Sequence, residues 1–204
     1  SLAGLKLRRL VGNETVRFFH SPYMRTRQTL QALLKASFAG QTVQISSEPR
    51  LREQDFGNFQ DPAAMDAIFV ERQAFGRFFF RFPNGEAGTD VFDRTASFIN
   101  YLMRTFGARG YHLNVAPQRT RRGKPKPVAN YVLVTHGLLM RVFCMCYLRW
   151  TVTEFEQVWN PSNGEMWVLQ KVPGKGIYEL KGRWRASRNT AGRFVDIKFG
   201  SDRA

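Results

Sequence analysis

Short apolar runs alternate with helical patterns along this chain. Four runs combine β-branched, aromatic and aliphatic residues in the way that buried strands do. They are TVRFFH (15–20), TVQIS (42–46), YVLVT (131–135) and MWVLQKV (166–172). The stretch GIYELKG (176–182) follows the last of them and is expected to pair beside it. The pattern therefore predicts a sheet assembled from strands that are far apart in the sequence.

Between these runs, apolar residues recur at the spacing of three and four residues that is typical of helices. After residue 20, Ser21 is a suitable N-cap, and Pro22 suits the first turn of a helix. Asp90 is a second start signal, because an apolar stripe follows it as far as Phe106. Further helices are expected over 2–11, over the Phe-rich stretch 63–80 and from Gly137 onward.

The alternation of strands and helices favours an α/β fold, in which a mostly parallel sheet lies between helices in a three-layer α/β/α sandwich. A chain of 204 residues can bury a core without disulfides or metal staples, so we expect a single domain over 1–204. A loop insertion at about 112–130 interrupts the pattern. Its centre, RTRRGKPK (119–126), has five basic residues and no acidic one. We interpret it as a solvated surface loop, with polyanion docking as the alternative.

Composition narrows the classes of function. Apolar residues make up 43% of the chain, which excludes a disordered protein, and no run approaches the ~20 apolar residues of a membrane span. The 31 basic and 16 acidic residues give a net charge of +15, which attracts phosphorylated metabolites, nucleic acid or acidic lipid surfaces. The two cysteines, Cys144 and Cys146, project from different faces of a helix and are not expected to pair. This usage suggests a reducing interior, with the cytoplasm as the default location.

Several catalytic chemistries find no support in the sequence. Three scattered histidines and one Cys-x-Cys pair are a poor ligand set, so neither a metal nor another cofactor is expected. Cys144 and Arg149 have four residues between them, which does not match the Cys-x5-Arg loop of cysteine phosphatases. The G-x-S-x-G turn of serine hydrolases is absent.

Four candidate site residues follow predicted strands. In open α/β sheets, ligands bind outside the carboxyl ends of the strands. His136 and Gly137 come at the end of the strand 131–135, where the glycine allows close approach of a ligand to the backbone. Arg25 lies in the first turn of the helix after residue 20, and Glu53 lies in the polar loop 50–62. Each signal is weak alone, because such residues are more often structural or solvated.

Four blocks in sequence order strengthen the interpretation. SPYMRTRQT, LREQDFGNFQ, FPNGEAGTDVFDR and VLVTHG resemble, in this order, the motifs of the histidine phosphatase superfamily, whose fold is that of phosphoglycerate mutase. Ala87 stands where serine is usual in the third block. The resemblance covers residues 21 to 137 and implies a pocket that binds a small phosphorylated metabolite or inorganic phosphate.

The resemblance also implies roles for individual residues. Arg25 and His136 would hold the phosphoryl oxygens, with further donors from the amides near Gly137. Glu53 would be the general acid that protonates the leaving oxygen. His20, Arg27, Arg77 and Arg81 could line the cleft, the helix 63–80 would form a wall or lid, and Asp90 and Arg94 would be a helix cap and a structural partner.

The nucleophile of the family is missing. Members open with a strand that ends in Arg-His-Gly, whose histidine carries the phosphoryl group. This chain has no such triplet, and its first residues resemble the helix after that strand. We expect a phosphomonoester hydrolase whose full-length parent supplies the histidine, so that the 204 residues alone are inactive. A phosphatase is favoured over a mutase, because LREQDFGNFQDPAAM leads straight into a helix.

Two alternatives stay open. The protein could be a catalytically inactive member of the family that binds phosphates without turnover. It could also be a basic nucleic-acid-binding domain, because Tyr178, Trp184 and Phe194 alternate with arginines near the end of the chain. No named nucleic-acid motif accompanies these residues.

Overall fold

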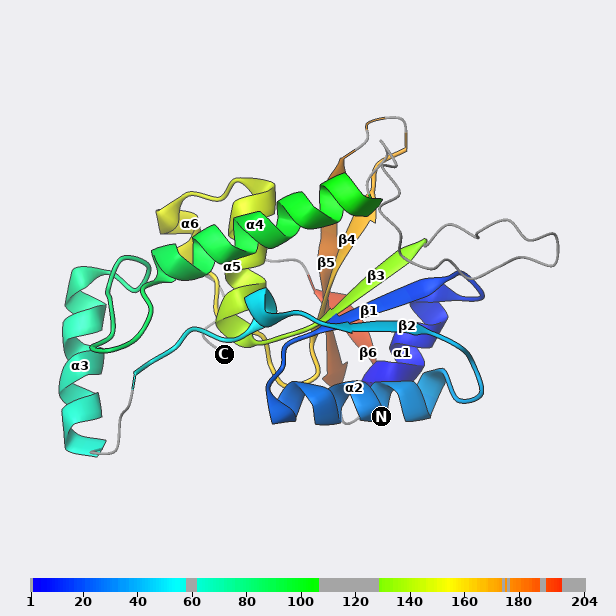
Figure 1. Ribbon diagram of the computed structural model, residues 1–204, viewed down its shortest axis with the longest axis horizontal. Helices are drawn as coiled ribbons and strands as arrows, with labels where there is room; N and C mark the ends of the chain where they lie inside the picture. Colours follow the sequence, from blue (N-terminus) through cyan, green and yellow to red (C-terminus); the bar gives the residue numbers. More distant parts are fainter. Residues whose placement is uncertain are drawn as a thin grey trace.

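A computed structural model describes residues 2–57, 62–106, 129–173, 175, 177–187 and 190–195 (Figure 1). Its elements are, in chain order, α1 (Leu2–Val11), β1 (Val16–His20), α2 (Met24–Ser37), β2 (Gln44–Ser47), the 3-10 helix η1 (Pro49–Leu51), α3 (Pro62–Phe75), α4 (Gly88–Phe106), β3 (Asn130–Val134), α5 (Gly137–Leu148), α6 (Val152–Gln157), β4 (Met166–Lys171), β5 (Tyr178–Ser187) and β6 (Thr190–Val195).

The strands form two three-stranded sheets. The first has the order β2-β1-β3 and is parallel throughout, with Phe19 of β1 opposite Ser46 and Leu133. The second has the order β4-β5-β6 and is antiparallel. The α/β class and the parallel sheet are as the sequence predicts, and β5 pairs beside β4 as expected. The antiparallel third strand, β6, was not predicted.

Alternate side chains of β1 face opposite helical layers. Phe19 packs in a cluster with residues of α4 and α5, whereas Phe18 packs in a second cluster with residues of α1 and α2. Both rings are almost completely buried, at 1% and 0% exposure. Figure 1 shows the same arrangement, with α1 and α2 on one side of the first sheet and α4 and α5 on the other. These two clusters hold the sheet between two layers of helices.

Two predicted boundaries were wrong. The helix expected over 63–80 ends at Phe75, and Gly76 then adopts a φ of +106°, which a side chain would disfavour and which breaks the helix. Ser21 does not cap α2, because the helix begins at Met24 after an extended Tyr23. A residue before proline is driven toward extended backbone, so Ser21 continues the strand direction instead of starting the helix.

The edges of β3 and β4 are only partly covered. Among the described residues, β3 pairs only with β1, and β4 pairs only with β5. Tyr131, Val132 and Leu133 of β3 are half-buried, as is the apolar first part of β4. Met166 of β4 nevertheless packs against the cluster that contains Val134 of β3. The two sheets therefore approach each other at apolar strand edges that share no ladder.

Some expectations concern residues whose structure is not described. The basic stretch 119–126 and His112 lie outside the described residues, as do the side chains of Trp184 and Phe194. The single-domain organisation over 1–204 therefore stays a prediction. Within the described part of the chain, no helix has both the length and the apolar character needed to cross a bilayer.

Candidate active site

The site begins where β1 and β3 end. Because the two strands are parallel neighbours, their carboxyl ends meet at one edge of the sheet. The Ser21 N–H donates to the Val134 carbonyl at 3.0 Å, which extends the pairing past both strands. His136 follows two residues later, and its Nε2 lies 2.8 Å from the Ser21 Oγ. The histidine side chain is 7% exposed and is thus fixed at the sheet edge.

Arg25 contacts the other nitrogen of this histidine. Its Nε–H donates to the His136 Nδ1 at 3.1 Å, and its guanidinium also lies 4.7 Å from the centre of the Tyr23 ring. An arginine nitrogen can only donate, so Nδ1 must be the acceptor and the ring proton must be on Nε2. The Nε2–H therefore donates to the Ser21 Oγ. The sequence signalled Ser21 only as a cap, yet its hydroxyl contacts His136 and accepts the Nε2–H that Arg25 dictates.

Glu53 lies at the N-terminus of α5. Its two carboxylate oxygens accept from the N–H groups of Leu138 and Leu139, each at 3.3 Å, and one also accepts from the Gln54 N–H at 3.2 Å. The first amides of a helix have no partner within it and carry partial positive charge, so they favour an anion. The resemblance implied that the amides near Gly137 bind phosphate. In the structure, the amides of Leu138 and Leu139 donate to the Glu53 carboxylate instead.

Arg94 of α4 holds the loop that carries Glu53. Its guanidinium donates to the carbonyls of Arg50, Arg52 and Glu53 at 2.7, 2.8 and 3.1 Å. It also pairs with both oxygens of the Glu86 carboxylate, each at 3.0 Å. Both side chains of this pair are largely buried, at 10% and 14% exposure. The structural role that the sequence assigned to Arg94 is therefore a clamp on the Glu53 loop.

The loop of Glu53 packs backbone to backbone against the segment that contains Glu86. The Glu86 N–H donates to the Asp55 carbonyl at 2.8 Å, and the Asp55 N–H donates to the Glu86 carboxylate at 2.9 Å. Gly57, with a φ of +80°, approaches the Pro83 carbonyl so closely that a Cβ would collide with it. Only glycine combines this backbone angle with this approach, which accounts for the glycine in the second block.

Burial shifts the pKa values of both titratable groups at the centre of the site. Burial raises the pKa of Glu53 above its ordinary value, and the helix amides and Arg25 only partly oppose that shift. Burial, with the charges of Arg25 and Arg94, lowers the pKa of His136 to about 4. The imidazole is therefore neutral at pH 7. The carboxyl takes up a proton more readily than an exposed glutamate does.

The structure brings together the main predicted residues, whereas a place in the cleft for the other candidates stays a prediction. Arg25, Glu53 and His136 converge around the start of α5, next to Gly137. The His20 Nδ1 contacts the carbonyl of Ser21, the residue that also contacts His136. Arg27 is exposed two residues along α2 from Arg25, and Arg81 pairs with Asp90 at the start of α4. Asp90 accepts from the Ala87 N–H at 2.9 Å, but it does so from inside the first turn, because α4 begins two residues before it, at Gly88.

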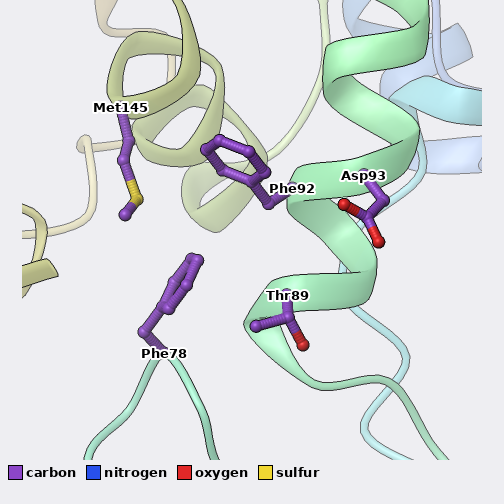
Figure 2. A pocket seen from close by; sticks show the side chains of 5 residues that line it. All are labelled: Phe78, Thr89, Phe92, Asp93 and Met145. Atoms are coloured by element: carbon purple, nitrogen blue, oxygen red, sulfur yellow. The ribbon is translucent and has the colours of Figure 1, made fainter. Parts of the chain in front are cut away.

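A separate apolar hollow lies between α4, α5 and the turn after α3 (Figure 2). It has a volume of about 170 Å³ and is lined by Phe78, Thr89, Phe92, Asp93 and Met145. The two aromatic rings and the thioether surround the gap, and Thr89 and Asp93 lie on its α4 side. None of the residues that converge at Glu53 lines it. In the described part of the chain, no group of three or more His, Cys, Asp or Glu could hold a metal ion.

Comparison with known proteins identifies the family. The sequence matches the family described as histidine phosphatase superfamily (branch 1) over residues 3–180. The chain belongs to the histidine phosphatase superfamily. The phosphoglycerate mutase-like protein AT74 of Arabidopsis thaliana is 40% identical over 184 residues, which are 87% of this chain and 55% of that protein. The broad-range acid phosphatase DET1 of Saccharomyces cerevisiae is 44% identical over 137 residues, which are 67% of this chain and 37% of that protein.

Solved structures of this histidine phosphatase fold confirm the architecture. The mycobacterial glucosyl-3-phosphoglycerate phosphatase in complex with VO3 has a TM-score of 0.63 at 21% identity, covering 91% of this chain and 84% of that one. YhfR of Bacillus stearothermophilus has a TM-score of 0.60 at 16% identity, covering 88% and 79%. The chain spans only 55% and 59% of the two Arabidopsis relatives. The family and the fold predicted from the four sequence blocks are thus confirmed.

Proposed function

We propose that the natural protein is a phosphatase that hydrolyses small phosphomonoesters through a phosphohistidine intermediate. The observation that carries this proposal is the convergence of Arg25, Glu53 and His136 around the N-terminus of α5. A fork of guanidinium donors, a neutral imidazole and a carboxyl with a raised pKa are the groups that phosphoryl transfer requires. The family membership and the acid phosphatase relative support the same reaction class.

In this proposal His136 binds phosphate and does not attack it. Its Nδ1 lone pair accepts from Arg25, and its Nε2 carries the proton that is directed at Ser21. Neither nitrogen therefore offers a lone pair to phosphorus. Arg25 lies exposed in the first turn of α2, and its terminal amino groups are suited to fork onto two phosphoryl oxygens. Binding of the anion beside His136 would favour its imidazolium form, which stabilises the charge of the transition state.

The nucleophilic histidine is proposed to come from a strand between β3 and β4, in a part of the natural protein outside these 204 residues. The support for this is the half-buried apolar side chains of β3 and β4, which share no ladder among the described residues. A strand in that position would pair with both edges. Because β3 is parallel to β1, the carboxyl end of an added parallel strand would come beside His136.

The reaction has two balanced steps. In the first, the nucleophilic imidazole forms an N–P bond while the bond from phosphorus to the ester oxygen breaks, and the Glu53 carboxyl gives its proton to that oxygen. In the second, water attacks phosphorus, Glu53 takes a proton from the water, and the N–P bond breaks to release inorganic phosphate. The enzyme then returns to its starting protonation state.

A phosphatase is proposed in preference to a mutase, with a small phosphorylated metabolite as substrate. In the sequence, the acidic block leads into α3 with few intervening residues. The names of several relatives with solved structures are those of phosphatases, one of them in complex with inorganic phosphate. These names describe those proteins and support the proposal only at the level of reaction class.

Hydrolysis of p-nitrophenyl phosphate by the full-length protein tests this function. We expect turnover that vanadate inhibits competitively, whereas the 204-residue chain alone should show none. A His136→Ala variant of the full-length protein should lose most of the turnover. Strong hydrolysis by the 204-residue chain would contradict the proposed nucleophile. Binding of random oligonucleotides that weakens steeply with salt, without hydrolysis, would instead favour a nucleic-acid-binding domain.

A further inference from the structure

The outward face of α1 exposes three leucines. Leu2 and Leu5 are 56% and 52% exposed, and Leu10 is 38% exposed. The opposite face of the helix supplies the packing against the rest of the protein, and its buried residues are Gly4, Leu7 and Val11. Within the described part of the chain, α1 therefore presents an apolar surface that the fold itself does not cover.

Basic side chains lie among these leucines. Lys6 and Arg9 come four residues after Leu2 and Leu5, so each basic residue is one helical turn from a leucine on the same face. Arg9 is exposed and Lys6 is half-buried. Arg8, in contrast, turns back onto the protein, where its guanidinium donates to two neighbouring side chains. The outward face of α1 thus combines leucines with positive charge.

The neighbouring helix adds positive charge and no acidic residue. α2 packs closely beside α1, since a Cβ on Gly4 would lie 2.7 Å from the Ser37 Oγ. Residues 1–47, which include both helices, contain seven basic residues and one acidic residue, Glu14. That carboxylate lies between α1 and β1 and accepts from the Asn130 Nδ2 at 2.7 Å. No carboxylate within α1 or α2 therefore offsets their positive charge.

The composition of this surface fits a lipid bilayer better than a macromolecule. We call the surface the leucine-basic face; its residues are Leu2, Leu5, Lys6, Arg9 and Leu10. Proteins bind nucleic acid with polar contacts to phosphates and with aromatic rings that stack on bases, but α1 has no aromatic residue. The cores of protein interfaces are depleted in lysine. At an anionic bilayer, leucines enter the boundary between headgroups and acyl chains, while lysine and arginine stay at the lipid phosphates.

We propose that the leucine-basic face of α1 docks the protein reversibly onto anionic membranes. This inference goes beyond the proposed phosphatase function and does not depend on it. A lysine or arginine near an anionic bilayer strengthens binding by about fivefold. A leucine that is about half exposed adds roughly three- to tenfold when the bilayer covers it. Because the helix is short, attachment requires both the leucines and the charges.

Cosedimentation of the full-length protein with lipid vesicles tests this surface. Vesicles of phosphatidylcholine alone are compared with vesicles in which about 30% of the lipid is phosphatidylserine, which gives them a negative surface potential. We expect the protein to bind the phosphatidylserine vesicles at least about tenfold more tightly. Added salt should weaken this binding, because it screens the charges. Equal binding to both kinds of vesicle, or binding to neither, would overturn the inference.

A leucine variant tests the apolar part of the surface. Leu2→Ser with Leu5→Ser should weaken binding to phosphatidylserine vesicles by about tenfold or more. The matched control is Val70→Ser with Phe75→Ser, which removes side chains that are 71% and 67% exposed on α3 and should leave binding unchanged. The leucine variant should also keep the urea midpoint of the unmodified protein. A lowered midpoint would mean that another segment of the natural protein covers these leucines, and it would overturn the inference, as would unchanged binding.

A charge variant separates this surface from the positive charge of the whole protein. Lys6→Gln with Arg9→Gln should weaken binding to phosphatidylserine vesicles by about tenfold or more. Arg104→Gln with Arg149→Gln removes the same charge from exposed positions on α4 and at the end of α5, in the opposite helical layer, and should change binding little. Equal losses in the two variants would overturn the inference. Binding of random single-stranded oligonucleotides that exceeds vesicle binding and is lost in the α1 charge variant would also overturn it, in favour of nucleic acid.

Discussion

Replacing Arg94 by methionine should release the loop that holds Glu53. Methionine keeps much of the apolar stem but removes every donor of the guanidinium. Three loop carbonyls, those of Arg50, Arg52 and Glu53, would lose a hydrogen bond. The Glu86 carboxylate, at 14% exposure, would lose the partner that pairs with both of its oxygens.

The expected loss of stability follows from these contacts. Removing one partner of a buried ion pair costs about 3–5 kcal/mol, because the other charge stays buried without compensation. Solvent screens this pair little, since Arg94 is only 10% exposed. The loss is a large share of the ~5–15 kcal/mol that stabilises a typical domain. Urea unfolding should show the midpoint falling by roughly 1–2 M.

The matched control is Arg104→Met, at an exposed position near the end of the same helix, which should leave the urea midpoint nearly unchanged. A double-mutant cycle with Glu86→Gln should give a coupling energy of about 0.5–3 kcal/mol, because the two residues share one interaction. Surface substitutions usually change the free energy of unfolding by no more than about 0.5 kcal/mol. If the change for Arg94→Met is that small, the clamp does not stabilise the loop.

Further predictions concern the central residues. Arg25→Ala should weaken competitive inhibition by inorganic phosphate by about tenfold or more, and an unchanged inhibition constant would remove Arg25 from the site. Glu53→Gln should slow the hydrolysis of alkyl phosphates by about 100-fold or more, but that of p-nitrophenyl phosphate much less. Equal slowing of both substrates would argue against Glu53 as the general acid. Because the pKa of Glu53 is raised, its acid form persists to higher pH, so alkyl phosphate turnover should fall as pH rises through that pKa, and the glutamine variant should lack this limb. The pKa of His136 is lowered from 6.5 to about 4, so protonation favours the unfolded chain and the unfolding free energy should fall by up to about 3 kcal/mol as pH falls across that range. His136→Gln should flatten this dependence, and an unaltered slope would contradict the buried neutral imidazole.

Local sequence patterns predicted the parts of the site that depend on one element each. His136 comes just after β3, Arg25 lies at the start of the helix after β1, and the loop of Glu53 follows β2. Sheet topology alone therefore brings the three together. The role of Ser21 was missed, because its contact with His136 joins residues 115 apart. The end of α3 was missed because Gly76 breaks a helix that the apolar pattern continues.

The grouping of Arg72, Arg77 and Arg141 could not be predicted from the sequence. Arg72, Arg77 and Arg141 come from α3, the turn after it and α5, and each is unremarkable in its own sequence context. They come together only because α6 packs beside α5 and presents its last carbonyls to that turn. Such contacts depend on how layers pack, which periodicity does not specify. The division of the strands into two sheets could not be predicted either. It depends on which strands pair, and the ordinary strand composition of β3 and β4 does not indicate that they do not pair with each other.

The most direct test is to locate the phosphoryl group on the enzyme. The full-length protein is mixed with excess p-nitrophenyl phosphate and denatured at alkaline pH, which preserves phosphohistidine, and its peptides are then mapped by mass spectrometry. We predict one phosphorylated histidine, in a segment outside the 204 residues, and none at His20, His112 or His136. A phosphoryl group on His136, or hydrolysis at the expected rate with no phosphohistidine, would contradict a site in which His136 binds phosphate and another strand supplies the nucleophile.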